Sequence, residues 1–286
     1  MEAKTPEAAE FRAGQRQQWN SAAAGWRKWS ELIDSSASAI SERLVELAGV
    51  EPGSRVLDVA AGYGEPSLTA ARAAGSEGGV VATDISAEMI AFGRERAAEA
   101  GLGNIEFVES DAAGLDFPEG SFDAALSRWG IIFEPEGEAA AARVRGFLKS
   151  GARMAISSWG PPERVPFLAV PMRTALQRLG VDPPPPGTPG PLSRPTPDAL
   201  GGLLSGGGFS DVDVEEAEVS FEWPSPEEFT TFIKEIAPPI SGLIAPHPQD
   251  VQDETWAAIT DAVRQAAADD GAVRFTNLVL LASGRA

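Results

Sequence analysis

Short apolar runs alternate with helical patterns through the middle of the chain. Val56–Val59 and Val80–Asp84 are rich in β-branched and apolar residues, which is typical of parallel strands covered on both faces. Ile105–Asp111 and Met154–Trp159 read as the third and fifth strands, and Phe122–Gly130 as the fourth strand with the loop that follows it. The alternation predicts an α/β fold with a doubly wound, mostly parallel sheet.

Small residues mark the ends of two predicted helices between these strands. Ser86 can cap the N-terminus of a helix over Ala87–Ala100, which Gly101 ends. Gly151 is predicted to end a second helix over Glu138–Lys149. Residues 51–160 are therefore predicted to form the core domain.

The segments that flank this core have different patterns. Residues 1–50 look helical, with apolar positions at helical spacing from Ile40 to Ala48 and Gly49 as a stop signal, and predict a helical N-terminal cap. Asp182–Pro197 carries eight prolines, which exclude a helix interior and a central strand. Residues 161–208 are accordingly predicted to be a proline- and glycine-rich crossover.

Composition limits the classes of function. The 286 residues include 42 acidic and 23 basic ones, and the formal net charge of −19 disfavours nucleic acid as a substrate. The absence of cysteine excludes disulfides and thiolate metal sites. No run approaches the ~18 apolar residues of a membrane span, and the first residues lack the apolar segment of a secretion signal. These features predict a cytoplasmic protein without a membrane span.

A glycine-rich turn follows the first predicted strand. In VLDVAAGYGEPSL, Val56–Leu68, Gly62 and Gly64 let the backbone turn tightly and approach a ligand. Asp58 stands four residues before Gly62 and no third glycine follows, unlike the dinucleotide fingerprint. The motif therefore predicts a nucleoside-bearing cofactor and favours one other than NAD.

Acidic residues end the next two predicted strands. Asp84 lies 20 residues after Gly64, a spacing at which a carboxylate can accept hydrogen bonds from ribose hydroxyls. Asp111 ends the third strand in the same way. Both strand ends are predicted to face the cofactor.

Four motifs at the predicted strand ends together resemble a known family. They are D-x-x-x-G-x-G at Asp58–Gly64, the acid at Asp84, S-D-A at Ser110–Ala112 and FDAALSRWG at Phe122–Gly130. The set is similar to class I S-adenosylmethionine-dependent methyltransferases, in particular the ubiquinone and menaquinone biosynthesis group. The resemblance implies a Rossmann-like seven-stranded sheet and S-adenosyl-L-methionine as the cofactor. It also implies that the glycine turn holds the methionine part, Asp84 the ribose and Asp111 the adenine amine.

The predicted cofactor site consists of these turns and their neighbours. Its residues are Asp58, Ala60, Gly62, Gly64, Asp84, Ile85, Met89, Asp111, Ala112, Ser127 and Trp26. Tyr63 stands where the family commonly has a small residue or threonine.

The last part of the chain, residues 209–286, fits the edge of that family's sheet. Phe209–Val219 alternates apolar and polar residues and Ala272–Ala282 reads as a closing strand, which together predict an antiparallel edge hairpin. Residues 220–271 between them carry two helical patterns where the family core needs only a turn. This helical lid insertion is predicted to close over a small-molecule acceptor, and a homodimer interface is the alternative.

Candidate bases are few. Methyl transfer requires in-line alignment and exclusion of water, and it requires a base only if the acceptor must lose a proton. His247, in the lid loop, and Glu163, after the fifth strand, are the candidates, and the alternatives are an exposed loop histidine and a surface carboxylate. No metal is predicted, because the spacing of the acidic residues does not demand one.

Other side chains flank the predicted cleft. Arg128 can pair with a carboxylate of the cofactor or substrate, or with Glu134 or Glu136. Glu65 can stabilise the adjacent helix start. Five tryptophans flank the predicted site and can hold a sulfonium or an apolar ring, or pack in the core: Trp19, Trp26, Trp29, Trp129 and Trp159.

The favoured hypothesis is a methyltransferase that acts on oxygen or carbon of a small apolar or aromatic acceptor. An NAD(P)-dependent Rossmann oxidoreductase is one alternative, because of the glycine turn and Asp84. A non-catalytic module that binds S-adenosylmethionine is the other.

Overall fold

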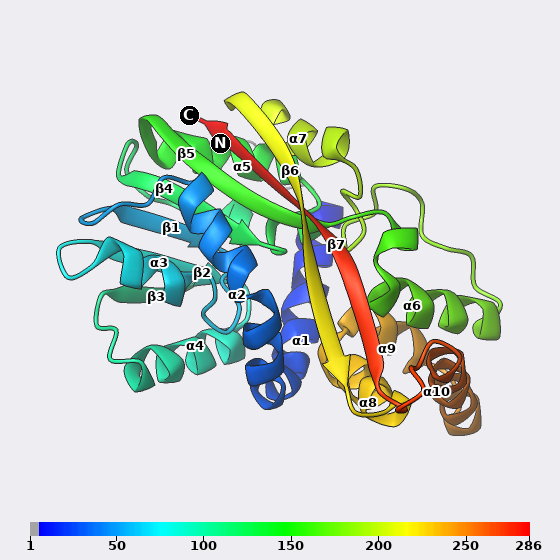
Figure 1. Cartoon of the computed structure of the whole chain (residues 1–286). Coiled ribbons are helices and arrows are strands. Elements are labelled where there is room, and N and C mark those ends of the chain that lie inside the picture. The colour runs from blue at the N-terminus through cyan, green and yellow to red at the C-terminus, as the bar shows by residue number, and fades with distance from the viewer. Residues whose placement is uncertain (1–5) are drawn as a thin grey trace.

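One seven-stranded sheet forms the centre of the protein, in the order β3-β2-β1-β4-β5-β7-β6 (Figure 1). The structure is a computed structural model and describes residues 6–286, so the first five residues of the predicted cap lie outside it. The strands β1 to β5 are parallel, β7 is antiparallel to β5, and β6 is antiparallel to β7. The strands are β1 Arg55–Val59, β2 Gly79–Asp84, β3 Ile105–Glu109, β4 Phe122–Arg128, β5 Leu148–Trp159, β6 Ser210–Trp223 and β7 Val273–Arg285. The predicted fold class is confirmed.

Alternate side chains of the parallel strands enter two hydrophobic clusters on opposite faces. Val56 and Leu126 pack in one cluster with α2 (Ser30–Leu47) and α3 (Ser67–Ala74). Leu57 and Ile156 pack in the other with α5 (Gly137–Phe147) and α7 (Pro197–Gly206). All four side chains are fully buried, which explains why these strands read as nearly continuous apolar runs.

The remaining helices lie around the sheet and beyond its antiparallel edge. They are α1 Pro6–Lys28, α4 Ala87–Glu99, α6 Pro166–Leu179, α8 Pro226–Ile236, α9 Pro238–Ile244 and α10 Gln249–Arg264, with short 3-10 turns η1 Ala112–Gly114, η2 Ile131–Phe133 and η3 Pro162–Arg164. Ser86 caps α4 as predicted, since its hydroxyl accepts a hydrogen bond from the Met89 N–H at 3.2 Å.

The two antiparallel strands are long enough to leave the rest of the sheet. β7 pairs with β5 only over Val279–Arg285, whereas its other end pairs with β6 alone, as far as Val273 opposite Trp223. This two-stranded ribbon reaches the helices α8, α9 and α10 (Figure 1). Phe221 and Trp223 on the ribbon pack against Phe232 of α8, with ring centroids 6.4 and 5.1 Å apart. The ribbon therefore provides an apolar surface on which the helical insertion packs.

Gly151 does not end a helix. The helix α5 ends at Phe147 and β5 begins at the next residue. Gly151 lies in β5 with φ of +83°, where the register against β4 shifts between the pairs Phe122–Leu148 and Ala124–Arg153. The prediction of a helix through Lys149 is wrong, because pairing with β4 takes over and the glycine conformation serves a strand irregularity.

Two segments predicted without helices contain them. Residues 161–208 hold α6 and α7 on either side of the proline-rich stretch, and α9 lies in the segment predicted to join the two helices of the insertion. Apolar positions of α6 such as Phe167 and Leu168 are buried. These segments form helices because their apolar side chains are buried against the rest of the protein.

Candidate active site

Two adjoining cavities lie at the carboxyl ends of the parallel strands. The first, the polar cavity, is lined by Val59–Tyr63 after β1, Asp84 and Ile85 after β2, Ser110–Ala112 after β3, Arg128–Ile131 after β4, and one side of α1. The second, the apolar cavity, lies between the sheet, α6 and the helical insertion. Trp19, Trp26, Trp129 and Phe133 line both cavities. Open α/β sheets bind ligands at this edge.

Asp84 holds the glycine turn in place. Its carboxylate accepts hydrogen bonds from the backbone N–H groups of Gly62 and Ser86, each at 2.8 Å. Burial raises the pKa of Asp84 to about 6, although these N–H groups lower it. Each carboxylate oxygen can accept more than one hydrogen bond, so Asp84 retains acceptor capacity toward the cavity that it lines.

Asp58 lies fully buried behind the same turn. One carboxylate oxygen accepts a hydrogen bond from the Ser67 hydroxyl at 2.6 Å, and the other, Oδ1, has no hydrogen-bond partner among residues 6–286. Burial raises the pKa of Asp58 to about 7. A buried carboxylate with an unsatisfied oxygen favours a cationic neighbour.

A network of side chains connects Arg128 to the N-terminal cap. The Tyr63 hydroxyl donates to Asp34 Oδ1 at 2.7 Å and accepts a hydrogen bond from Arg128 Nη2 at 3.2 Å. Arg128 Nη1 donates to the Ser41 hydroxyl at 2.8 Å. Arg128 is buried, and within residues 6–286 it makes no ion pair with a carboxylate. Burial raises the pKa of the Tyr63 hydroxyl, so this hydroxyl stays neutral.

Arg12 links α1 to the segment that follows η2, across the polar cavity. Its Nε donates to Glu134 Oε1 at 2.9 Å and its Nη2 to Glu136 Oε2 at 2.7 Å. The alternative in which these carboxylates pair with Arg128 is therefore wrong. Arg12 Nη1 is buried without a hydrogen-bond partner in the described part of the chain.

Most of the predicted cofactor residues come together. Those that line the polar cavity are Trp26, Ala60, Gly62, Asp84, Ile85, Met89, Asp111 and Ala112. The other three predicted residues do not line the cavity: Asp58, Gly64 and Ser127. The Ser127 hydroxyl donates to the Val59 carbonyl at 2.7 Å and accepts a hydrogen bond from the Ile131 N–H at 2.9 Å. Ser127 thus joins β1 to the loop after β4.

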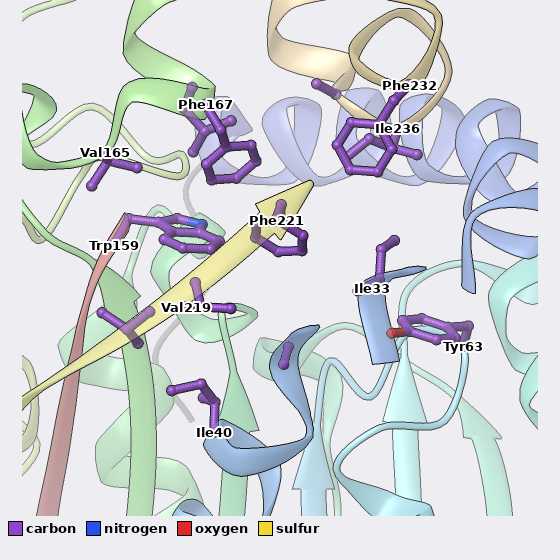
Figure 2. Packing of buried hydrophobic residues seen from close by; sticks show 14 of the residues in the cluster. Ile33, Ile40, Tyr63, Trp159, Val165, Phe167, Val219, Phe221, Phe232 and Ile236 are labelled. Carbon is purple, nitrogen blue, oxygen red and sulfur yellow. The ribbon is translucent and has the colours of Figure 1, made fainter. Parts of the chain in front are cut away.

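The apolar cavity contains no charged side chain among its described lining residues, which are aromatic, aliphatic, proline or, at Met172, methionine. Trp159 of β5, Phe167 of α6 and Phe221 of β6 form a continuous aromatic wall, with successive ring centroids 4.8 and 5.3 Å apart (Figure 2). Phe232 and Ile236 of α8 and the first residues of α9 close the opposite side. The insertion therefore borders the cavity, as the lid interpretation expects.

The two candidate bases lie away from both cavities. His247 follows α9, and Glu163 is an exposed residue of η3. Neither lines the polar or the apolar cavity. Their role as bases stays a prediction, without support from this arrangement.

Several lining residues were not predicted. Arg12 and Gln15 come from α1, and Phe167, Leu168 and Met172 from α6. The apolar spacing of α6 could have indicated a buried helix, but nothing local indicates which cavity it meets. Trp29, which was predicted near the site, donates to Glu235 of α8 at 2.6 Å and lines neither cavity.

From Pro6 to the C-terminal residue, no helix is long and apolar enough to span a bilayer. Over the same range, no three acidic or histidine side chains converge as metal ligands would.

Part of the chain is similar in sequence to known proteins. Residues 56–151 match the family model described as a methyltransferase domain. The ubiquinone/menaquinone biosynthesis C-methyltransferase UbiE of Teredinibacter turnerae is 37% identical over 120 residues, which are 42% of this chain and 48% of that protein. The chain thus spans about half the length of the curated relative that it matches.

Solved structures share the fold over most of the chain. A putative methyltransferase from Bacillus halodurans has a TM-score of 0.57 at 18% identity and covers 86% of this chain and 98% of its own. The [4+2]-cyclase SpnF has a TM-score of 0.55 at 19% identity and covers 88% of this chain and 82% of its own.

The chain therefore shares the fold of the putative methyltransferase from Bacillus halodurans, with two cavities at the carboxyl ends of its parallel strands. Residues 56–151 of this chain match a methyltransferase domain. The resemblance predicted from the sequence is confirmed.

Proposed function

We propose that the protein transfers a methyl group from S-adenosyl-L-methionine to carbon or oxygen of a small apolar, aromatic acceptor. One observation carries the proposal: the polar cavity at the strand ends adjoins a cavity lined by apolar side chains, and four aromatic residues border both. A donor in the first and an acceptor in the second would meet at this shared wall.

The charged groups of the polar cavity suit the amino acid end of the cofactor. Arg128 is a buried cation without a carboxylate ion pair among the described residues, and Asp58 Oδ1 is a buried anionic oxygen without a partner there. In the proposal Arg128 binds the methionine carboxylate and Asp58 stabilises the ammonium group from behind the turn. Asp84 accepts from the ribose hydroxyls, and Asp111 faces the adenine amine.

The chemistry follows from this placement. When bound, S-adenosylmethionine would supply an electrophilic methyl group, and the electron pair of the broken sulfur–methyl bond would return to sulfur as the new carbon–carbon or carbon–oxygen bond forms. The residues of the apolar cavity orient the acceptor and exclude water, which are the main requirements of this reaction. Among the described residues that line this cavity, none is a histidine or a carboxylate that could act as a base. The acceptor would therefore enter as an electron-rich phenolate. Methylation at its oxygen then needs no further proton loss, and after methylation at carbon the displaced ring proton passes to water.

Methylation at carbon is the favoured outcome. The matched relative from Teredinibacter turnerae is a C-methyltransferase by name. That protein acts in ubiquinone and menaquinone biosynthesis, whose products are aromatic in their reduced form. An acceptor of this kind matches the aromatic wall of the apolar cavity.

Calorimetry and mass spectrometry test the proposal in two steps. S-adenosylhomocysteine should bind with micromolar affinity and NAD should not. With deuteromethyl-labelled S-adenosylmethionine, reduced 1,4-naphthoquinone or 1-naphthol should gain the label, and glycine, a polar acceptor, should not. Binding of NAD alone would favour the oxidoreductase alternative, and tight binding of S-adenosylhomocysteine without turnover of any acceptor would favour the non-catalytic module.

A further inference from the structure

Trp129 occupies an unusual position between the two cavities. It follows β4 directly, lines both cavities, and has φ of +53°, a left-handed conformation that bulky residues rarely adopt. Its backbone N–H donates to the Ser157 hydroxyl at 3.0 Å. Such conformations persist where the surrounding structure requires them, often at functional sites.

The plane of the Trp129 ring is held by its neighbours. Trp159 stacks on it with ring centroids 4.4 Å apart and an interplanar angle of 5°. The guanidinium carbon of Arg128 lies 5.4 Å from the ring centroid. The indole is thus held in one orientation at the shared wall.

The indole N–H groups around the apolar cavity differ in their hydrogen bonds. Trp19 donates to Gln15 Oε1 at 2.9 Å, and Trp26 donates to the Ile236 carbonyl at 3.0 Å. The Nε1 of Trp129 is buried and has no acceptor within residues 6–286. A buried donor without a partner is costly and is normally satisfied.

We propose that the Trp129 indole N–H donates a hydrogen bond to an oxygen of the acceptor and so selects among apolar rings. The inference rests on the proposed function and narrows it. The acceptor class becomes an apolar aromatic molecule that carries a carbonyl, hydroxyl or phenolate oxygen next to the atom that is methylated. Rings without such an oxygen would leave the N–H buried and unsatisfied, so they would bind more weakly.

Trp223 provides a matched control. Its indole N–H is also buried without a partner among the described residues, but it lies in the core between Phe229, Phe232 and Phe275 and lines neither cavity. Trp223→Phe removes an equivalent donor away from the site. Trp129→Phe removes the donor and retains an aromatic ring at the shared wall.

A matched pair of probes isolates the hydrogen bond. 2-Acetylnaphthalene and 2-isopropenylnaphthalene have nearly the same shape and differ by an oxygen in place of a methylene group. With the protein saturated with S-adenosylhomocysteine, the wild type should bind the ketone about three- to tenfold more tightly, as measured by calorimetry. Trp129→Phe should bring the ratio close to one, and Trp223→Phe should leave it unchanged.

A second measurement does not depend on the folding of a variant. In wild-type protein labelled with nitrogen-15 at the indole groups, the ketone should shift one buried indole N–H signal downfield and the hydrocarbon should not. Equal binding of the two probes with no such shift would overturn this inference and leave the proposed function intact. If neither probe binds, the apolar acceptor site itself is refuted, and this inference with it.

Discussion

Asp58→Asn should stabilise the protein in the absence of cofactor. Burial raises the pKa of Asp58 from 3.8 to about 7, which corresponds to about 4 kcal/mol of stability lost when the folded protein must hold this group ionised. Since the folded-state pKa is the higher one, the loss begins near pH 4, where the group ionises in the unfolded chain, and is complete above pH 7. Asparagine keeps the shape and the acceptor for Ser67, but its amide N–H lacks a partner, which costs about 1 to 3 kcal/mol. The expected net gain at pH 8 is therefore about 1 to 3 kcal/mol.

Urea denaturation between pH 5.5 and 8.5 measures this effect. The gain of Asp58→Asn over the wild type should grow by about 2 kcal/mol across that range, because the wild type loses stability while the neutral amide does not. Asp213→Asn, at an exposed position of β6, controls for the removal of one negative charge. A gain that does not change with pH, or a loss of stability at pH 8, would refute the account of Asp58 as a strained buried anion. Affinity for S-adenosylhomocysteine should fall in the same variant.

Four further variants test other parts of the structure. Asp84→Ala should weaken binding of S-adenosylhomocysteine by about 1.5 to 3 kcal/mol for each charged hydrogen bond lost, and undiminished affinity in calorimetry would place the ribose elsewhere. Gly25→Ala should destabilise the packing of α1 on α8 by about 1 to 3 kcal/mol, because its Cβ would lie 2.3 Å from the Glu235 carbonyl oxygen. Gly14→Ala, in the same helix with nothing within 4 Å of the new Cβ, should instead raise the free energy of unfolding by about 0.5 to 1 kcal/mol. His247→Ala should leave turnover unchanged, because His247 lines neither cavity; a large loss of turnover would restore it as a candidate base.

The residues that line the polar cavity at the strand ends were largely predictable because their signals are local. Gly62 with φ of +56° and Asp84 at a strand end lie within short motifs, and the sheet brings such strand ends to one edge. The structure gives Asp84 one role that the sequence did not predict. Its carboxylate also binds the Gly62 N–H, a contact across 22 residues that orders the turn itself.

The helices around the two cavities were less predictable because the contacts that place them join residues distant in sequence. Arg12 meets Glu134 across 122 positions, and Trp26 donates to Ile236 across 210. Neither contact leaves a local pattern. The same holds for Gly151, whose conformation suits both a helix end and a strand irregularity until pairing with β4 decides.

The amino-acid sequence by itself determined the alternation of strands and helices, the glycine turn and the acids at the strand ends, because backbone conformation and the covering of a sheet on both faces act on neighbouring residues. Only the tertiary structure decided which apolar side chains of α1, α6, β6 and α8 surround one cavity, and that the indole N–H of Trp129 has no acceptor among residues 6–286. Hydrophobic burial is non-directional, so an apolar pattern indicates that a face is covered without indicating what covers it.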